Sequence, residues 1–309
     1  MQNITLSSSQ KIYIASDFHL GYSKDIEGND SLEREKKILR WLEMVRKDAE
    51  LIILLGDIFD FWYEYKKTIP KGFVRLQGKI AEITDSGIDV VFFTGNHDLW
   101  MFGYFEKELG VKVYHKPQFV NWNNKKIHLG HGDGLGNGDY SYKFMKKALF
   151  KNPVCRFFFE WLHPNIGIGL AHFWSNSRKP SKKQKPKKTK QIDSYKGKEQ
   201  EWIWNYCNQI HQQNPQDYYV FGHRHLPLMI EVSKQGNKKL ENKSEKLDKK
   251  IIAPIEDSQT EPNNKSYYFN TGEWMNHFTY LIFEVENTSH GATFKRCCFE
   301  ADTKWIIDK

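Results

Sequence analysis

Five short apolar runs dominate the hydrophobic pattern of this chain. They cover residues 11–16, 51–55, 90–94, 126–130 and 218–221. Runs of this length without a polar break predict strands that are buried on both faces of a sheet. Each run is followed by Asp, Asn or His, either directly or after a single glycine. Because parallel strands end at one edge of a sheet, the pattern predicts that these polar side chains gather there.

Helices are predicted between the strands. The periodicity indicates a helix from Asp30 or Ser31 to about Ala49, with an apolar face that includes Trp41 and Leu42. Further helices are predicted over about 72–86, 101–109 and 193–212. Shorter strands are predicted over 111–114, 119–122, 228–232, 267–269, 280–285 and 293–299, and residues 1–10 are read as a polar lead-in. The alternation of strands and helices indicates an α/β fold.

Two stretches interrupt this pattern. Residues 140–212 interleave aromatic and basic side chains, and they are interpreted as a helical cap insertion that contains a lysine-rich loop at 179–190. The insertion is either a second core of ordinary helices or an apolar, basic surface for a lipid chain or a membrane face. Residues 233–265 are polar and predict a flexible loop. We expect a single domain over 1–309.

Composition narrows the class of protein. The net charge is +8 and the pI about 9.0, which favours an acidic partner, although the lysine run accounts for much of the excess. The four cysteines form no CxxC pair, so a reduced, cytoplasmic chain is expected rather than a disulfide scaffold. Neither a signal peptide nor an apolar stretch of about 18 residues is evident, which argues against a membrane-spanning protein.

Seven metal-ligand side chains follow the predicted strands. Carboxylate, carboxamide and imidazole together suit Mn²⁺, with Fe or Zn²⁺ as alternatives, better than Ca²⁺ or Mg²⁺. Seven ligands exceed the needs of one tetrahedral ion, so we expect two divalent metal ions bridged by one carboxylate. Asp57 is the expected bridge, because its strand is central. The expected ligands are Asp17, His19, Asp57, Asn96, His131, His223 and His225.

Catalytic roles are assigned to His97 and Asp98. His97 adjoins the ligand Asn96, so it is placed to protonate a leaving oxygen or to stabilise phosphoryl charge. Asp98 is the candidate to orient His97, and Asp60 the candidate to orient a ligand histidine.

These motifs, D-x-H, GDxxD, GNHD, HGDG and GHRH, resemble those of the calcineurin-like metallophosphoesterase superfamily over about residues 12–273. The resemblance implies a four-layer α/β/β/α sandwich. It also implies a dinuclear centre built from the seven ligands.

Within the superfamily the chain is most similar to the UDP-2,3-diacylglucosamine diphosphatase family. The similarity lies in the segment 57–62, in the cap insertion, and in positions that match the family's substrate contacts. It implies cleavage of the UDP-linked glycolipid to UMP and 2,3-diacylglucosamine 1-phosphate, a step of lipid A biosynthesis, by a cytoplasmic protein that lies peripherally on the inner membrane. The expected substrate contacts are Asp139, Tyr142, Asn176, Ser177 and Arg178.

Two other functions stay open. GNHD is also compatible with a soluble phosphodiesterase or phosphatase that acts on a nucleotide or phosphoprotein. The lysine run is compatible with a non-catalytic nucleic-acid or membrane binder, although a full ligand set would then have no purpose. We therefore expect no nucleic-acid partner, and the oligomeric state stays open.

Overall fold

Two six-stranded sheets form the centre of the molecule in the computed structural model, which describes residues 1–22, 30–136, 152–167, 169, 195, 197–232, 265–285 and 291–300. One sheet has the order β12 (Ala292–Cys298), β11 (Thr279–Val285), β2 (Lys11–Ala15), β3 (Ala49–Leu54), β4 (Asp89–Phe93) and β5 (Lys112–Tyr114). The other has the order β1 (Asn3–Ile4), β6 (Gln118–Trp122), β7 (Lys125–Gly130), β8 (Tyr218–Phe221), β10 (Ser266–Asn270) and β9 (Met229–Val232). Strands β2 to β5 are parallel, as are β7, β8 and β10.

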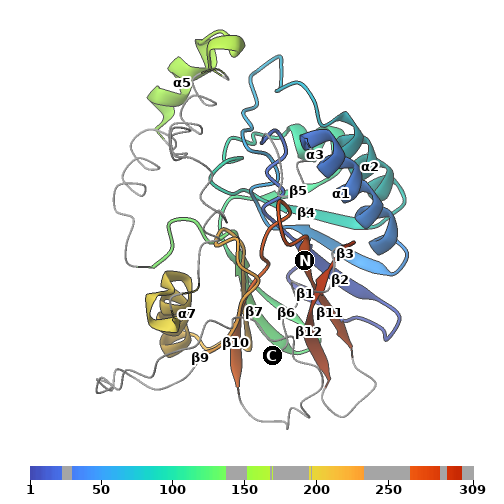
Figure 1. Ribbon diagram of the computed structural model, residues 1–309, viewed down its shortest axis with the longest axis vertical. Coiled ribbons are helices and arrows are strands. Elements are labelled where there is room, and N and C mark those ends of the chain that lie inside the picture. Colours follow the sequence, from blue (N-terminus) through green and yellow to red (C-terminus); the bar gives the residue numbers. More distant parts are fainter. Residues whose placement is uncertain are drawn as a thin grey trace, which may run out of the picture.

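Helices cover the outer faces of both sheets (Figure 1). Helices α1 (Ser31–Val45), α2 (Val74–Asp85) and α3 (Tyr104–Leu109) lie against the sheet of β2 to β5. Helix α7 (Trp202–Gln213), preceded by the short helix η2 (Lys198–Gln200), packs on the sheet that contains β8. Helix α5 (Pro153–Trp161) stands apart at the top of Figure 1. The predicted four-layer α/β/β/α sandwich is thus confirmed.

Strand β3 shows why its sequence lacks the usual polar alternation. Ile52 and Leu54 face the helices α1 and α2, whereas Leu51 and Ile53 face the second sheet. All four side chains are buried. Because successive side chains of a strand point to opposite faces, a strand between two packed layers must be apolar at every position.

Helix α1 begins as predicted but ends earlier. The Asp30 carboxylate accepts hydrogen bonds from the backbone N–H of Leu32 and Glu33, at 3.0 and 3.1 Å, and so caps the helix. The predicted end near Ala49 is wrong, because the helix stops at Val45 and Ala49 already pairs with Lys11 in the sheet. The residues from Ala49 onward instead form β3, which pairs with β2.

Other boundaries also differ from the predictions. The lead-in of residues 1–10 contains β1, whose Asn3 aligns with Asn121 of β6. Helix α7 begins at Trp202, later than the periodicity from 193 indicated. The lysine-rich loop, residues 233–264 and much of 140–212 lie outside the described residues, so the domain boundaries stay predictions.

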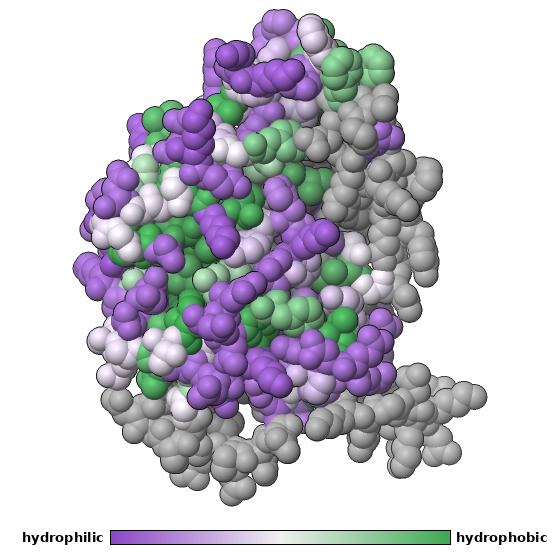
Figure 2. Space-filling view, turned by 180° about the vertical axis from the view of Figure 1, so that it is seen from behind, coloured by the Kyte–Doolittle hydropathy of each residue, from purple (hydrophilic) through white to green (hydrophobic). Residues whose placement is uncertain are grey.

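The surface of the described part is mixed. On the face seen in Figure 2, hydrophilic side chains are interspersed with smaller apolar areas. Among the residues that the structure describes, no helix combines the length and the apolar character that a bilayer crossing requires.

Candidate metal centre

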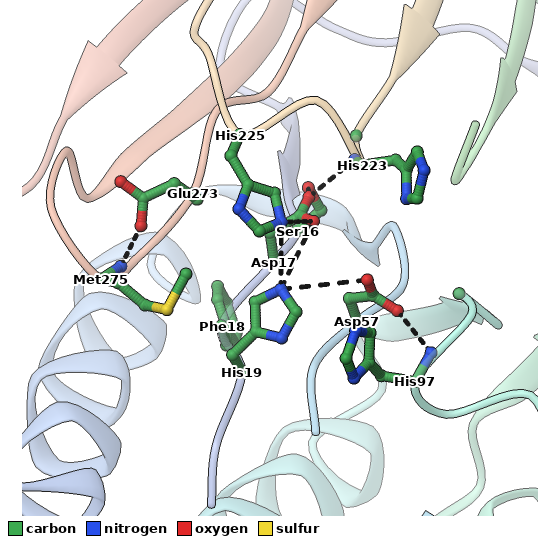
Figure 3. Close-up of polar contacts among 12 residues, drawn as sticks. Ser16, Asp17, Phe18, His19, Asp57, His97, His223, His225, Glu273 and Met275 are labelled. Atoms are coloured by element: carbon green, nitrogen blue, oxygen red, sulfur yellow. Dashed lines mark hydrogen bonds and ion pairs between the residues drawn. The ribbon is translucent and has the colours of Figure 1, made fainter. Parts of the chain in front are cut away.

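The polar turns after five strands meet at one edge of the sandwich. Asp17 and His19 follow β2, Asp57 follows β3, and Asn96 follows β4, all in one sheet. The other sheet contributes His131 after β7 and the pair His223 and His225 after β8. All seven predicted ligands therefore lie at the carboxyl ends of their strands, and Figure 3 shows the side chains of Asp17, His19, Asp57 and His225 converging.

The first group of potential ligands consists of Asp17, His19, Asp57 and His225, whose ligand atoms all lie within 4.8 Å of one another. The His225 Nε2 is 3.1 Å from both Asp17 Oδ1 and His19 Nε2. The His19 Nε2 is 3.9 Å from Asp57 Oδ2. These donor atoms point toward one another (Figure 3), which is the arrangement that a shared cation requires.

A second group shares one carboxylate with the first. Asp57, His131 and His223 also have ligand atoms within 4.8 Å of one another. The His131 Nε2 lies 3.2 Å from Asp57 Oδ2, the same oxygen that faces His19. Two ligand groups with a common carboxylate match a pair of metal ions bridged by Asp57.

Several buried ligand atoms in this cluster lack a hydrogen-bond partner: Asp17 Oδ1, Asn96 Oδ1 and His131 Nε2. Buried polar atoms are nearly always paired, because an unpaired one costs free energy. Asn96 lies between Gly95 and His97, and the backbone N–H of His97 donates to Asp57 Oδ1 at 2.9 Å. The residues present thus fit divalent metal ions, which would satisfy all three atoms.

The backbone at the ligands is unusual. A positive φ costs a residue other than glycine roughly 1 kcal/mol or more, and such residues gather at functional sites. Most of the seven predicted ligands adopt it: Asp17 (55°), His19 (44°), Asp57 (52°), His223 (68°) and His225 (59°). The turns are held in this conformation by the surrounding structure, which aims the side chains inward.

Two glycines let these turns approach one another. A Cβ at Gly95 would collide with the Asp57 carboxylate. A Cβ at Gly222 would lie 2.7 Å from Asp17 Oδ2. In the native turn the backbone N–H of His223 donates to that oxygen at 3.0 Å. Glycine therefore allows close approach of the turns after β3 and β4 within one sheet, and of the turn after β8 to Asp17 across the two sheets.

The charges of the cluster are complementary. Burial opposes protonation of His19, but Asp17 and Asp60 outweigh it and raise the His19 pKa to about 10. Burial likewise opposes the charged form of His131, and the Asp57 carboxylate raises its pKa to about 10. Burial raises the Asp57 pKa, yet His131 and His97 bring it well below its usual range. The ionised carboxylates attract positive charge, which protons supply here and metal ions would replace.

His97 is held at the rim of the cluster. Its Nδ1–H donates to the Asp60 carbonyl at 2.8 Å, and its ring lies 4.9 Å from that of His19. The Asp60 carboxylate is 3.7 Å from the Nδ1 atoms of both histidines. Because Nδ1 is engaged, Nε2 is the atom of His97 that is left for a substrate.

Asp98 has a different position from the one expected. Its carboxylate accepts from the backbone N–H of Gly95 at 2.7 Å and of Ile58 at 2.7 Å, and from that of Asp57 at 3.2 Å. These contacts do not support the interpretation that Asp98 orients His97. Asp98 instead joins the turns after β3 and β4, and burial together with the Asp57 charge raises its pKa to about 7.

Arg34 is a structural determinant that the sequence reasoning missed. Its buried guanidinium donates from Nε to the Phe18 carbonyl at 3.0 Å and from Nη2 to the His19 carbonyl at 2.8 Å. It therefore fixes the backbone of the D-x-H turn from helix α1. The available signal was its spacing four residues before Ile38, which places a charge on the apolar face of the helix.

The five predicted substrate contacts are not placed. Asp139, Tyr142, Asn176, Ser177 and Arg178 lie outside the described residues. Their roles stay predictions.

Comparison with known proteins agrees with this geometry. The family model of the calcineurin-like phosphoesterases matches residues 10–227. The UDP-2,3-diacylglucosamine hydrolase of Porphyromonas gingivalis is 34% identical over 241 residues, which cover 74% of this chain and 88% of that protein. The protein of the same name from Histophilus somni is 24% identical over 220 residues, covering 70% of this chain and 84% of the relative.

The matched region includes the turns after β2, β3, β4, β7 and β8, from which all seven candidate ligands project. The match covers more than half of the chain. This chain belongs to the calcineurin-like phosphoesterase family.

Proposed function

We propose that the protein hydrolyses the pyrophosphate of UDP-2,3-diacylglucosamine, releasing UMP and 2,3-diacylglucosamine 1-phosphate, as a step of lipid A biosynthesis. The observation that carries the hydrolytic chemistry is the pair of ligand groups that share Asp57. The substrate is supported by the relatives named UDP-2,3-diacylglucosamine hydrolase, the first of which is similar over most of both chains.

The ligand chemistry favours two Mn²⁺ ions. One group offers two carboxylates and two imidazoles, and the other offers two imidazoles with the shared carboxylate. Mixed oxygen and imidazole donors suit Mn²⁺, with Fe or Zn²⁺ as the alternatives. When bound, such ions supply Lewis-acid stabilisation of the phosphoryl oxygens and of the attacking water.

The chain's own residues position the reacting groups. The backbone N–H of His97 donates to Asp57 Oδ1 at 2.9 Å, which fixes the bridging carboxylate relative to the turn that carries His97. The Asp60 carbonyl fixes the His97 ring, whose Nε2 is the donor for a phosphoryl oxygen of the substrate. Since the leaving group is a phosphate monoester of low basicity, stabilisation of charge is the role that we assign to His97.

The exposed side of helix α5 supports a membrane partner. Phe158 is 69% and Trp161 73% exposed, although both are large apolar side chains. Such residues on a helix surface are typical of contact with a lipid interface. This exposure supports our proposal that the protein, expected in the cytoplasm, binds peripherally to the inner membrane, where its lipid substrate would reside. Asp139, Tyr142, Asn176, Ser177 and Arg178 remain the proposed substrate contacts.

Product analysis tests the substrate. Incubation with UDP-2,3-diacylglucosamine and Mn²⁺ in ¹⁸O-enriched water is expected to yield UMP and the lipid phosphate in equal amounts, with ¹⁸O in UMP because water attacks the α-phosphorus. Mass spectrometry of both products provides the measurement, and chelator should abolish the reaction. If small phosphodiesters are cleaved but the lipid is left intact, the enzyme acts on a soluble ester instead.

Vesicle binding tests the membrane partner. We expect Phe158→Ser with Trp161→Ser to reduce co-sedimentation with anionic phospholipid vesicles by about tenfold, because two large apolar side chains are lost from the interface. Val74→Ser removes an equally exposed apolar side chain, 74% exposed at the start of α2, and is the control that should bind as the wild type does. Equal binding by all three proteins would exclude α5 as the membrane contact.

A further inference from the structure

A cluster of aromatic side chains joins helix α5 to the rim of the metal centre. Phe61, Tyr63 and Tyr65 are buried, and Trp100 packs against them. The fifth member, Phe159, comes from α5. The first four lie on the two segments that directly follow Asp60 and Asp98 in the sequence.

These two segments are tied together along their backbones. The Trp62 N–H donates to the His97 carbonyl at 3.1 Å, and the Glu64 N–H donates to the Trp100 carbonyl at 3.0 Å. Tyr63 and Trp100 form a parallel bridge between the two hydrogen bonds. The side chains of Phe61, Tyr63, Tyr65 and Trp100, here called the aromatic floor, are therefore carried by backbone segments that are hydrogen-bonded to each other and to the His97 carbonyl.

Phe159 fits into this floor. Its ring centroid lies 4.7 Å from that of Tyr63, and it stacks on Trp100 at 6.2 Å and 10° and on Tyr65 at 6.2 Å and 21°. On the same helix Phe157 is 53% exposed, and among the described residues its ring contacts are with Phe158 and Trp161 of α5 itself. Two phenylalanines of one helix thus differ in their surroundings. Phe159 packs on Tyr63, Tyr65 and Trp100, whereas Phe157 is exposed.

One polar group in this contact has no hydrogen-bond partner. The Tyr65 hydroxyl is buried without a hydrogen-bond partner, and a Cβ at Gly167 would collide with it. Burial raises the Tyr65 pKa to about 12. When the helix leaves, water can solvate this hydroxyl, so its burial opposes docking while the ring contacts of Phe159 favour it. The stability of the contact between α5 and the aromatic floor therefore depends on two opposing contributions, the burial of the Tyr65 hydroxyl and the ring contacts of Phe159.

We propose that Phe159 is a positioning residue that docks α5 onto the aromatic floor beside His97, and that this docking selects lipid-linked over small phosphoesters. The inference rests on the proposed function. On this proposal the acyl chains of a lipid-linked substrate contact the exposed apolar side chains of α5, such as Phe158 and Trp161, while its pyrophosphate lies at the metal centre, so the relative placement of helix and centre affects its reaction. A small ester occupies the centre alone.

Hydrogen–deuterium exchange tests the docking without any substrate. In the metal-loaded full-length chain, Phe159→Ala is expected to speed exchange of the α5 amides severalfold, because the ring contacts that hold the helix are lost. Tyr65→Phe should slow it, because the unpaired hydroxyl is removed. Phe157→Ala, the matched control, should leave it unchanged. If Phe159→Ala and Phe157→Ala have equal effects on exchange, or if Tyr65→Phe also speeds exchange, the proposed docking of α5 by Phe159 is refuted.

Kinetics test the selectivity. The substrates are a short-chain, water-soluble diacyl analogue of the UDP-sugar lipid and a small aryl phosphodiester. For Phe159→Ala, the ratio of kcat/KM on the first to kcat/KM on the second should fall about tenfold, since misplacement affects only the extended substrate. An unchanged ratio overturns the selectivity. If the wild type does not cleave the analogue, the proposed function fails, whereas the exchange experiment still decides whether Phe159 docks α5.

Discussion

Replacing Asp57 with asparagine is expected to reduce hydrolysis by about 10³-fold or more, because the bridging carboxylate contributes several kcal/mol through the metal pair. Asp57 Oδ2 faces His19 on one side and His131 on the other, so one substitution affects both ligand groups. Asparagine keeps the shape and an oxygen that accepts from the His97 N–H, but it removes the charge that two cations share. The loss should therefore reflect metal binding rather than misfolding.

Metal analysis and thermal unfolding separate these causes. The wild type should retain about two Mn²⁺ per chain after desalting, and Asp57→Asn less than one. Added Mn²⁺ should raise the wild-type Tm, because a ligand that binds the folded state stabilises it, and should leave the variant's Tm almost unchanged. Asp89→Asn, an exposed carboxylate at the opposite end of β4, is the control. Full metal content and activity in Asp57→Asn would contradict the bridged centre.

Replacing His97 with alanine is expected to lower kcat by about 10²-fold while the metal content stays normal, as removal of a donor to transition-state charge does. The backbone N–H that holds Asp57 is retained in the alanine variant, so the ligand groups keep their shape. The side chain that is removed is fixed through its Nδ1 by the Asp60 carbonyl, which leaves Nε2 for the substrate. KM should change little.

Leaving-group dependence identifies what His97 does. If it stabilises phosphoryl charge, as we assign, the His97→Ala substitution costs the same factor on the lipid pyrophosphate and on a nitrophenyl phosphodiester. A far larger loss on esters with a basic alkoxide leaving group would show a general acid instead. His115→Ala, which replaces an exposed histidine after β5, should match the wild type. A variant His97→Ala that loses its metal would show that the residue supports the centre rather than the reaction.

Much of the centre was predictable, because the rule that locates it is local. Apolar runs such as 51–55 specify buried strands, and the polar residues that follow them must then lie at the strands' carboxyl ends. The ligand types and their spacing, as in His223 and His225, narrowed the chemistry to divalent metals. The five strands lie where the apolar runs predicted them, with shifts of one or two residues.

The remaining features depend on contacts between residues far apart in the chain. Neither the left-handed φ of Asp57 nor the burial of Arg34 beneath the D-x-H turn follows from local preference, because packed neighbours impose both. Asp98 was assigned from its adjacency to His97, yet its carboxylate bonds across to the turn after β3.

The sequence by itself determined which side chains stand at the strand ends, because alternation and burial act within each strand. Only the tertiary structure decided that the strand ends belong to two different sheets that meet, and that Phe159 of α5 packs on Tyr63, Tyr65 and Trp100. The physical reason is that the stacking of the sheets and the docking of α5 are set by complementary packing across the whole chain, which no local pattern encodes.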